Sequence, residues 1–452
     1  MIVESWLARA ARRRPQQLAL QDGRGKLTYA QLYTQALAGA TALAQQGIAR
    51  GDSVAVALAP GIPFAVALHA CWLAGAGAVP VDVRFSAAER EAITAGSALV
   101  IDRPLLVAET EAGPSLTASL PHDLDLDAVA VVIHTSGTTS QPKRVALTFG
   151  NLLWSAQGSA VALAVDPQER WLCTLPVCHV GGLSILARSA IYATTAVVHE
   201  RFDTEQALDA LMTQEITLVS VVATTLVRLL DAGLAHPPRL RCALAGGGPV
   251  PRALLERAAA AGVPVCQTYG LTEACSQVST VPLDCLAGAG PAGVAAMGAG
   301  RPLFCARVRI DRDGEILIAG PTVAPAALAE DGWLHTGDLG SLDADGNLHL
   351  IGRKADTIIS GGENVAPAEV EAILEAHPHV AEAAVVGRSD ARWGEAVTAI
   401  VVPRAGVALD TELLREHCAA HLAPYKVPKQ VLAITGPLPR TRSGKLLRRQ
   451  LA

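Results

Sequence analysis

The chain has 452 residues, which exceeds one ordinary hydrophobic core, so two or more domains are expected. Half of the residues are hydrophobic but only 4% are aromatic, so Ala, Val, Leu and Ile must build the core. A net charge of −5 without a basic stripe argues against a nucleic-acid partner.

The cysteines indicate a reducing compartment. There are nine, an odd number, and none forms a Cys-x-x-Cys pair. This pattern predicts a cytoplasmic protein with small buried thiols. Cys173 and Cys178 lie close to His179, but no second cluster of Cys and His completes a set of metal ligands, so no zinc site is expected.

Residues 53–81 contain no Asp, Glu, Lys or Arg and could be mistaken for a membrane span. Pro60, Gly61 and Pro63 interrupt the run, whereas a spanning helix needs about 20 continuous apolar residues. The segment is therefore predicted to form a strand at 54–59, a buried helix at 64–75 and a strand at 78–81. The first residues do not resemble a secretory signal.

Short strands alternate with helices as far as residue 230. The expected strands lie at 54–59, 128–133, 196–199 and 218–222, and the expected helices at 32–46, 151–164, 204–214 and 225–232. Such alternation predicts βαβ units, and hence an α/β fold with mostly parallel sheets and flanking helices.

The character of the chain changes near residue 306. Strands expected at 306–310, 315–318 and 348–351 are separated by Asp-Gly turns, which predicts a small barrel-like part. The last hundred residues predict a small α+β domain, with helices at 367–376 and 411–421 and strands at 381–386 and 396–402. The expected division is a large domain over 1–352, a hinge at 353–356 and a small domain over 357–452.

A loop after the strand at 128–133 carries the side chains of a phosphate site. It contains Thr135, Ser136, Gly137, Thr138, Thr139 and Lys143. Backbone N–H groups, hydroxyls and an ammonium can together hold a phosphate. The loop is not a Walker A motif, because no Gly-Lys-Ser/Thr follows at the required spacing. A polar surface loop is the alternative interpretation.

Further motifs accompany this loop. They are Leu175-Pro176-Val177-Cys178-His179, Gly246-Gly247-Gly248-Pro249, Tyr269-Gly270-Leu271-Thr272-Glu273, Trp333-Leu334-His335-Thr336-Gly337-Asp338, Gly352-Arg353-Lys354, Ser360-Gly361-Gly362-Glu363-Asn364 and Ser443-Gly444-Lys445. Together, over nearly the whole chain, this set resembles the adenylate-forming superfamily of acyl-CoA synthetases, luciferases and peptide-synthetase adenylation domains.

The resemblance implies a two-step ligase that uses ATP, Mg²⁺ and coenzyme A. A carboxylate first attacks the α-phosphate and releases diphosphate, and a thiol then attacks the acyl-adenylate. It also implies that the small domain rotates between the two steps. A non-catalytic binding protein of the same fold is disfavoured by the presence of Lys445, Glu273 and Asp338.

The resemblance also assigns residues. Lys445 would be the catalytic lysine of adenylation, with Thr272 contacting phosphate and Glu273 holding Mg²⁺. Tyr269 would stack near adenine, and Gly246, Gly247 and Gly248 would allow close approach of adenine or the acyl group. Asp338 and Arg353 would bind the ribose, and Gly361 and Gly362 would line the channel of the pantetheine arm.

The acid is expected not to be an amino acid. His179, a catalytic and substrate-binding candidate, stands where amino-acid-activating relatives typically carry Asp. The other candidates for the acid pocket are Ser184, Arg228, Gly247 and Ser276. Arg228 is the one permanent cation of residues 219–230, so a second carboxylate on the substrate would give it a partner.

Several stretches resemble one subfamily, the 2-succinylbenzoate–CoA ligases of menaquinone biosynthesis. They include Thr148-x-Gly150-Asn151, His179-Val180-x-Gly182-Leu183-Ser184 and Thr272-Glu273-Ala274-Cys275-Ser276-Gln277. The alternatives are a ligase for another aryl or medium-chain fatty acid, and an adenylation module that loads a separate carrier protein.

The chain departs from the family pattern at three positions. Ser140 and Arg144 replace glycines of the phosphate loop, and Ala355 stands where many relatives carry Asp at the pivot. The sequence leaves open whether the chain forms a homo-oligomer.

Overall fold

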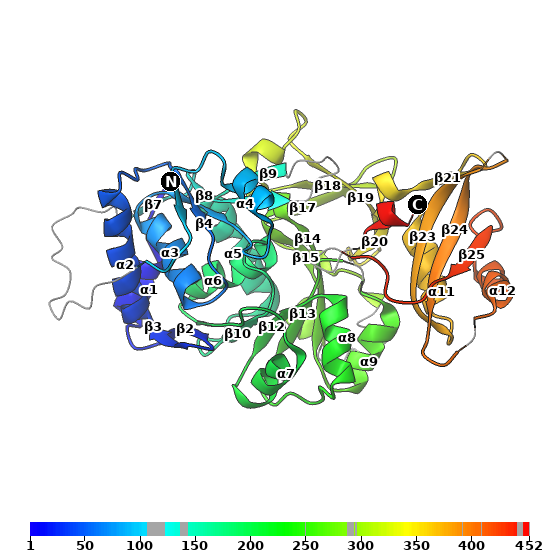
Figure 1. The fold of residues 1–452 in the computed structure, drawn as a ribbon, viewed down its shortest axis with the longest axis horizontal. Coiled ribbons are helices and arrows are strands. Elements are labelled where there is room, and N and C mark those ends of the chain that lie inside the picture. Colours follow the sequence, from blue (N-terminus) through cyan, green and yellow to red (C-terminus); the bar gives the residue numbers. More distant parts are fainter. Residues whose placement is uncertain are drawn as a thin grey trace. The chain divides into compact units, whose positions relative to one another are not determined.

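The computed structural model describes residues 1–105, 123–135, 143–248, 250–286, 293, 296–390, 392–407, 409–440 and 446–451. The chain divides into two compact units (Figure 1). The first comprises Met1–Val250, Glu256–Arg307 and Ile318–Leu334, and the second comprises Pro251–Leu255, Val308–Leu317 and His335–Ala452. Residues 353–356 thus lie within the second unit, and their role as a hinge stays a prediction.

A nine-stranded sheet is the centre of the first unit. In spatial order its strands are β16 (Arg301–Pro302), β15 (Ser276–Thr280), β14 (Val265–Leu271), β13 (Cys242–Ala245), β12 (Leu218–Val221), β10 (Arg170–Cys173), β11 (Thr195–Val198), β2 (Leu18–Asp22) and β3 (Gly25–Thr28). The strands from β14 to β2 are parallel. Every residue of β11, β12 and β13 is buried, as expected for interior parallel strands covered on both faces.

A five-stranded sheet carries the phosphate-loop motif. Its strands in order are β6 (Leu99–Ile101), β4 (Ser53–Val56), β5 (Gly77–Pro80), β8 (Val129–Thr135) and β9 (Lys143–Thr148), and a separate pair joins β1 (Ile2–Glu4) to β7 (Asp123–Asp125). Only β8 and β9 pair antiparallel in the five-stranded sheet. The predicted α/β architecture with mostly parallel sheets is confirmed.

Helices flank these sheets. They are α1 (Trp6–Arg13), α2 (Tyr29–Gln45), α3 (Ile62–Leu73), α4 (Ala87–Thr94), α5 (Phe149–Leu163), α6 (Val180–Tyr192), α7 (Thr204–Thr213), α8 (Ala223–Asp231) and α9 (Arg252–Ala260), with 3₁₀ turns η1 (Thr272–Ala274), η2 (Leu283–Leu286) and η3 (Pro325–Ala327). Thr28 and Thr148 begin α2 and α5 with capping boxes, each pairing with the residue three positions on.

The uncharged segment 53–81 folds as predicted, with α3 as the buried helix that connects the neighbouring parallel strands β4 and β5. All residues of α3 from Phe64 to Leu73 are buried, and Trp72 meets Trp6 and Phe149 edge-on at centroid distances of 6.0 and 5.8 Å. Among the described residues, none of the helices combines the length and the apolarity needed to cross a membrane.

The second unit contains two sheets. The first has strands β17 (Arg307–Ile310), β18 (Glu315–Ala319), β19 (Leu334–Leu342) and β20 (Leu348–Arg353), with a few residues of these strands assigned to the first unit. The second has β22 (Glu363–Val365), β21 (Ile358–Ser360), β24 (Gly394–Pro403) and β23 (Val380–Asp390), with β25 (Gln430–Ala433) paired to β24.

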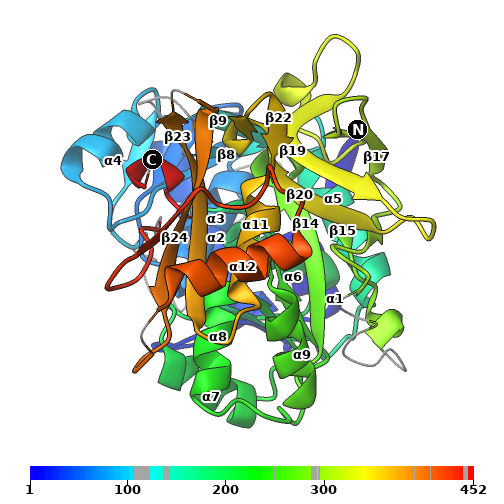
Figure 2. The same cartoon turned by 90° about the vertical axis from the view of Figure 1, so that its right-hand side faces the viewer.

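Two helices cover one face of the second sheet (Figure 2). They are α11 (Pro367–Glu375) and α12 (Thr411–His421), and short turns η4 (Lys354–Asp356) and η5 (Arg448–Gln450) lie before and after them in the chain. Val370, Leu374 and Leu414 pack with Val385 and Val397 in this core. The small α+β part predicted for the last hundred residues is confirmed.

Candidate active site

The phosphate-loop motif lies between the paired ends of β8 and β9. Thr135 is the last residue of β8 and is paired with Lys143, the first residue of β9. The Thr135 hydroxyl lies 3.4 Å from the Lys143 carbonyl oxygen. Ser136, Gly137, Thr138 and Thr139 lie outside the described residues, so the structure places the two ends of this loop.

Lys143 and Glu273 meet across the two sheets of the first unit. Their ammonium and carboxylate groups lie 3.2 Å apart, and the Glu273 side chain is 17% exposed against 59% for Lys143. Glu273 lies in η1, which follows β14, beside Thr272. The pair sets a cation and a carboxylate beside the phosphate loop, which are the groups needed for phosphate and for a magnesium ion.

Parallel strands bring three of the motifs to one edge of the nine-stranded sheet. His179 follows β10, Gly246–Gly248 follow β13, and Tyr269 lies near the end of β14, three residues before Thr272. The carboxyl ends of parallel strands are where ligands bind in open α/β sheets. Tyr269 is buried, and the preceding Thr268 donates a hydrogen bond to Ser279 of β15.

The glycines at this edge have different tasks. A Cβ on Gly246 would lie 2.7 Å from Cγ2 of Thr268, and one on Gly270 would lie 1.6 Å from the Ser276 carbonyl oxygen. These two glycines are therefore required by close packing of the strands. Gly247 has φ +79°, and a Cβ on Gly248 would meet none of the described residues within 4 Å. Gly248 is the position at which a ligand could approach the backbone.

His179 is the N-cap of α6 but makes no side-chain capping bond. Its pKa is lowered, chiefly because burial disfavours the charged ring; Asp82 opposes this shift and Arg84 adds to it. The ring is therefore neutral near pH 7. Within the described ranges, no group of three or more His, Cys, Asp or Glu side chains could hold a metal ion.

Arg188 is a functional candidate that the sequence analysis missed. It lies on α6, nine residues after His179, and is only 2% exposed. Its Nη2 donates to Ser155 Oγ at 3.0 Å, its guanidinium lies 5.5 Å from the centre of the Trp171 ring, and its Nε has no hydrogen-bond partner among the described residues. A buried cation with so few partners favours an anion from outside the chain.

Arg188 also borders the acid pocket that the sequence predicts. Ser155, its partner, donates to the carbonyl oxygen of Cys275 at 2.6 Å, and Cys275 precedes Ser276. Ser276 has φ +88° at the start of β15. The signal was present in the sequence, because Arg188 is the one charged residue between Val180 and Ile191.

Arg228 and Ser184 have other surroundings. Arg228 lies on the exposed side of α8, with its guanidinium 5.0 Å from the centre of the Phe202 ring. Ser184 is buried and donates to the Gly181 carbonyl oxygen at 3.1 Å, within its own helix. The substrate roles of both residues stay predictions.

In the second unit, Asp338 and Arg353 form the expected donor and acceptor pair. They are partners in the register of β19 and β20, and Arg353 Nε lies 2.9 Å from Asp338 Oδ1. Thr336 supports the carboxylate residue by accepting from its backbone N–H at 3.0 Å. A carboxylate and a guanidinium together suit the vicinal hydroxyls of a ribose.

Gly361 and Gly362 form the two-residue turn between β21 and β22, with φ of +62° and +86°. These angles are those of a type I′ hairpin, which favours glycine. Gly361 N–H donates to the Trp393 carbonyl oxygen at 2.7 Å, and Arg392 and Lys429 each lie 4.9 Å from the centre of the Trp393 ring. The sequence analysis did not identify this cluster of aromatic and basic side chains. Lys445 lies outside the described residues.

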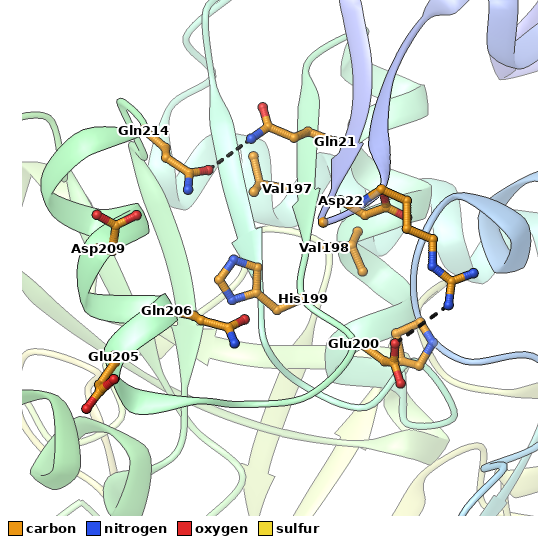
Figure 3. Close-up of a pocket in the computed structure, with 13 residues that line it drawn as sticks. Gln21, Asp22, Val197, Val198, His199, Glu200, Glu205, Gln206, Asp209 and Gln214 are labelled. Atoms are coloured by element: carbon orange, nitrogen blue, oxygen red, sulfur yellow. Dashed lines mark hydrogen bonds and ion pairs between the residues drawn. The ribbon is translucent and has the colours of Figure 1, made fainter.

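A cavity of about 560 Å³ lies elsewhere in the first unit (Figure 3). Its charged lining comprises Asp22, Glu200, Glu205 and Asp209 against Arg24, which lies 3.9 Å from Glu200. The Asp22 carboxylate already has backbone partners, because it accepts hydrogen bonds from the N–H groups of Arg24, Gly25 and Ile62. This excess of carboxylates would repel phosphates, and none of the predicted site residues lines the cavity.

Comparison with known proteins agrees with this geometry. The model of the family described as AMP-binding enzyme matches residues 7–326, and that of its C-terminal domain matches residues 369–445. The chain therefore belongs to the family of AMP-binding, adenylate-forming enzymes, and it is an AMP-forming acid–CoA ligase.

Several proteins to which the chain is similar are ligases of one kind. A 2-succinylbenzoate–CoA ligase of Bacillus licheniformis is 38% identical over 99% of both chains. The o-succinylbenzoate CoA synthetase (MenE) of Bacillus subtilis, in complex with the acyl-adenylate OSB-AMP, has a TM-score of 0.88 at 36% identity, covering 100% of this chain and 98% of that one. The same enzyme with ATP and magnesium has a TM-score of 0.86 at 36% identity over both whole chains.

Proposed function

We propose that this enzyme joins 2-succinylbenzoate to coenzyme A, forming 2-succinylbenzoyl-CoA, AMP and diphosphate, in menaquinone biosynthesis. The relatives named above act on this acid or hold its adenylate. The observation that carries the proposal within this chain is Arg188, a buried guanidinium beside the predicted acid pocket whose Nε has no hydrogen-bond partner in the described part of the chain.

The first half-reaction activates the succinyl carboxylate. Its oxygen attacks the α-phosphorus of ATP, the bond to the bridging oxygen breaks, and diphosphate leaves. Thr135, Ser136, Gly137, Thr138, Thr139 and Lys143 would hold the phosphates, Thr272 would contact them, and Lys445 would neutralise charge in the transition state.

Glu273 is the residue that would hold Mg²⁺. Its carboxylate already accepts a cation, since Lys143 lies 3.2 Å away, and carboxylate oxygen is a ligand that Mg²⁺ prefers. When bound, the ion supplies neutralisation of phosphate charge. Tyr269 and Gly246–Gly248 would contact adenine or the acyl group, and Asp338 with Arg353 would hold the ribose.

The second half-reaction forms the thioester. The thiol sulfur of coenzyme A, having lost its proton, attacks the adenylate carbonyl, and AMP leaves. We place the pantetheine arm near the Gly361–Gly362 turn. Trp393 with Arg392 and Lys429 provides a ring and two cations suited to the phosphorylated nucleotide of coenzyme A. We further propose that residues 357–452 reorient about 353–356 between the steps.

Arg188 favours a diacid over a monoacid. A second carboxylate would accept from its Nε, for which the described residues provide no partner, and would remove the cost of an uncompensated buried cation. His179, neutral at pH 7, adds a polar group without a second charge. The nine free cysteines support a reducing, cytoplasmic location.

The test compares two substrates that differ by one carboxylate. Thioester formation with Mg-ATP and coenzyme A is measured for 2-succinylbenzoate and for 4-oxo-4-phenylbutanoate, which lacks the ring carboxylate. Arg188→Met should raise KM for 2-succinylbenzoate at least tenfold and change KM for the monoacid less than threefold. Arg228→Met is the matched control on the exposed face of α8.

The role of Arg188 and the proposed function would each be contradicted by either of two results. Equal effects of Arg188→Met on both acids would remove Arg188 from the carboxylate site, and a larger effect of Arg228→Met would return that role to Arg228. Preference of the unmodified enzyme for benzoate or octanoate would exclude 2-succinylbenzoate as substrate. Accumulation of adenylate without thioester would indicate a carrier-protein partner.

A further inference from the structure

One arginine near the C-terminus joins four segments of the second unit. Arg448, in η5, makes a two-pronged contact with Glu371 of α11, in which Nη2 lies 2.9 Å from Oε2 and Nη1 contacts Oε1. Nη1 also donates to the Val385 carbonyl oxygen of β23 at 3.1 Å, and Nε donates to Asp356 Oδ2 of η4 at 3.3 Å. Four of the five N–H donors of a guanidinium are therefore used.

The contact with Asp356 connects the tail to the ribose residues. Asp356 ends η4, which directly follows Arg353, the partner of Asp338. Lys354 fixes the same turn to β18 and its preceding loop, because its ammonium lies 3.1 Å from Glu315 and 2.5 Å from Asp313. The turn behind Arg353 is thus held on one side by Lys354 and on the other by Arg448.

The tail is also fixed on both sides of residues 441–445, which lie outside the described residues. Upstream, Arg440 Nη2 lies 2.8 Å from Glu382 of β23, and Arg440 forms a β-bridge with Leu446. Downstream, the Leu447 N–H donates to the Pro439 carbonyl oxygen at 2.9 Å. Leu446 packs against a buried apolar cluster on β23 and β24. The residues on either side of 441–445 are therefore held against β23 and its neighbours.

We propose that Arg448 is a positioning residue for adenylation, which ties the C-terminal tail to the turn behind Arg353 so that the two are presented together. The inference rests on the proposed function, because it acts through Lys445 in the first half-reaction. An arginine is needed there since a single fork must reach Glu371, Val385 and Asp356 at once.

The experiment measures the two half-reactions separately. Adenylation is followed by ATP–diphosphate exchange with 2-succinylbenzoate, and thioester formation is followed from supplied 2-succinylbenzoyl-adenylate and coenzyme A. Arg448→Ala should lower kcat of exchange at least tenfold, leave KM for ATP within threefold, and leave the second half-reaction within twofold. Arg448→Lys, which keeps the charge, should recover part of the loss.

Arg449→Ala is the matched control, because it removes the exposed neighbouring charge, and it should change both half-reactions less than twofold. Asp356→Asn should lower exchange severalfold and add little to Arg448→Ala, since the contact between Arg448 and Asp356 is already lost in Arg448→Ala. Equal losses in both half-reactions, or additive effects of the two substitutions, would overturn the inference.

Lys445→Ala separates this inference from the proposed function. Normal exchange in Lys445→Ala would overturn the catalytic assignment of Lys445 and the role of Arg448 with it. Impaired exchange in Lys445→Ala beside normal exchange in Arg448→Ala would overturn the positioning role alone. Should Arg448→Ala fail to fold, Arg448→Lys and Asp356→Asn provide the test. Each should lower exchange and leave the second half-reaction within twofold.

Discussion

Arg188 in the first unit and Arg448 in the second are both largely removed from water, yet their surroundings are opposite. Among the residues that the structure describes, Arg188 donates one hydrogen bond, to Ser155, and lies against the Trp171 ring, and its Nε has no partner. Arg448 uses four donors on Glu371, Val385 and Asp356. A satisfied cation holds parts of the protein together, whereas an unsatisfied one carries a cost that an anionic ligand can relieve.

The same contrast extends to the two units. The nine-stranded sheet presents its motifs through buried apolar strands and close backbone packing, as at Gly270. The second unit joins its elements through ion pairs at Lys354, Lys426, Arg440 and Arg448. The first unit should therefore be sensitive to added volume, and the second to loss of charge or to a change of pH.

Substitutions that remove a charge at the Arg448 site and at the Arg188 site should have the most different effects on stability. Glu371→Ala removes one carboxylate partner of Arg448 and the acceptor of the Val385 N–H. The free energy of unfolding of the second unit should therefore fall by about 3–5 kcal/mol. Arg188→Met removes an uncompensated buried cation and should leave stability unchanged or raise it. Urea unfolding of both variants measures this difference, and equal destabilisation would remove the contrast.

Added volume tests the packing of the first unit. Gly270→Ala would place a Cβ 1.6 Å from the Ser276 carbonyl oxygen, so β14 and β15 must separate at a cost of about 3 kcal/mol. Gly248→Ala meets none of the described residues within 4 Å and should leave the melting temperature unchanged. Thermal unfolding distinguishes the two variants. A stable Gly270→Ala protein would show that the sheet edge is not tightly packed.

The sequence predicted those parts of the fold that depend on local patterns. Strand and helix alternation placed β4, β8, β11 and β12 with the helices α3, α5 and α7, whereas α4 and α6 were not predicted. The helix α12 was predicted with the bounds it has. The uncharged segment was recognised as a buried helix because Pro60 and Pro63 interrupt it. Local spacing carries this information, since periodicity depends on neighbours in the chain.

Contacts between distant residues could not be predicted in the same way. Asp338 and Arg353 were both predicted to bind the ribose, but their mutual pairing was not predicted. The strand β19 was not identified either, because Gly337 and polar residues hide its alternation. The partners of Arg188 and Trp393 depend on how separate elements pack. The same argument that singled out Arg228, a lone cation in an apolar helix, applied equally to Arg188.

A substitution in the cluster at Trp393 should have a moderate effect on the KM for coenzyme A. Lys429→Met keeps most of the side-chain volume but removes the cation 4.9 Å from the ring centre, so KM for coenzyme A should rise about tenfold. KM for ATP should not change. Lys26→Met, an exposed lysine of β3, is the control. An unchanged KM for coenzyme A would place the nucleotide of the cofactor elsewhere.

The smallest expected effect is a loss of stability of the second unit in acid, caused by a cluster of histidines. His377 is buried between the ring of His379, at a centroid distance of 5.0 Å, and that of His417 on α12, at 5.1 Å. Burial lowers the pKa of His377, and the charges of His417 and His379 lower it further. Its Nδ1 accepts from the His379 N–H at 3.2 Å, which requires that nitrogen to be unprotonated.

Because the pKa of His377 is lower in the folded state than the value of about 6.5 in the unfolded chain, the unfolded chain binds the proton more readily. The stability contributed by neutral His377 is therefore complete above pH 6.5 and is lost as the pH falls through the folded pKa. Urea unfolding at pH 7.5 and pH 5.5 should show this loss, and His377→Gln should reduce it. A loss of equal size in His377→Gln would show that groups other than His377 cause the acid sensitivity of the second unit.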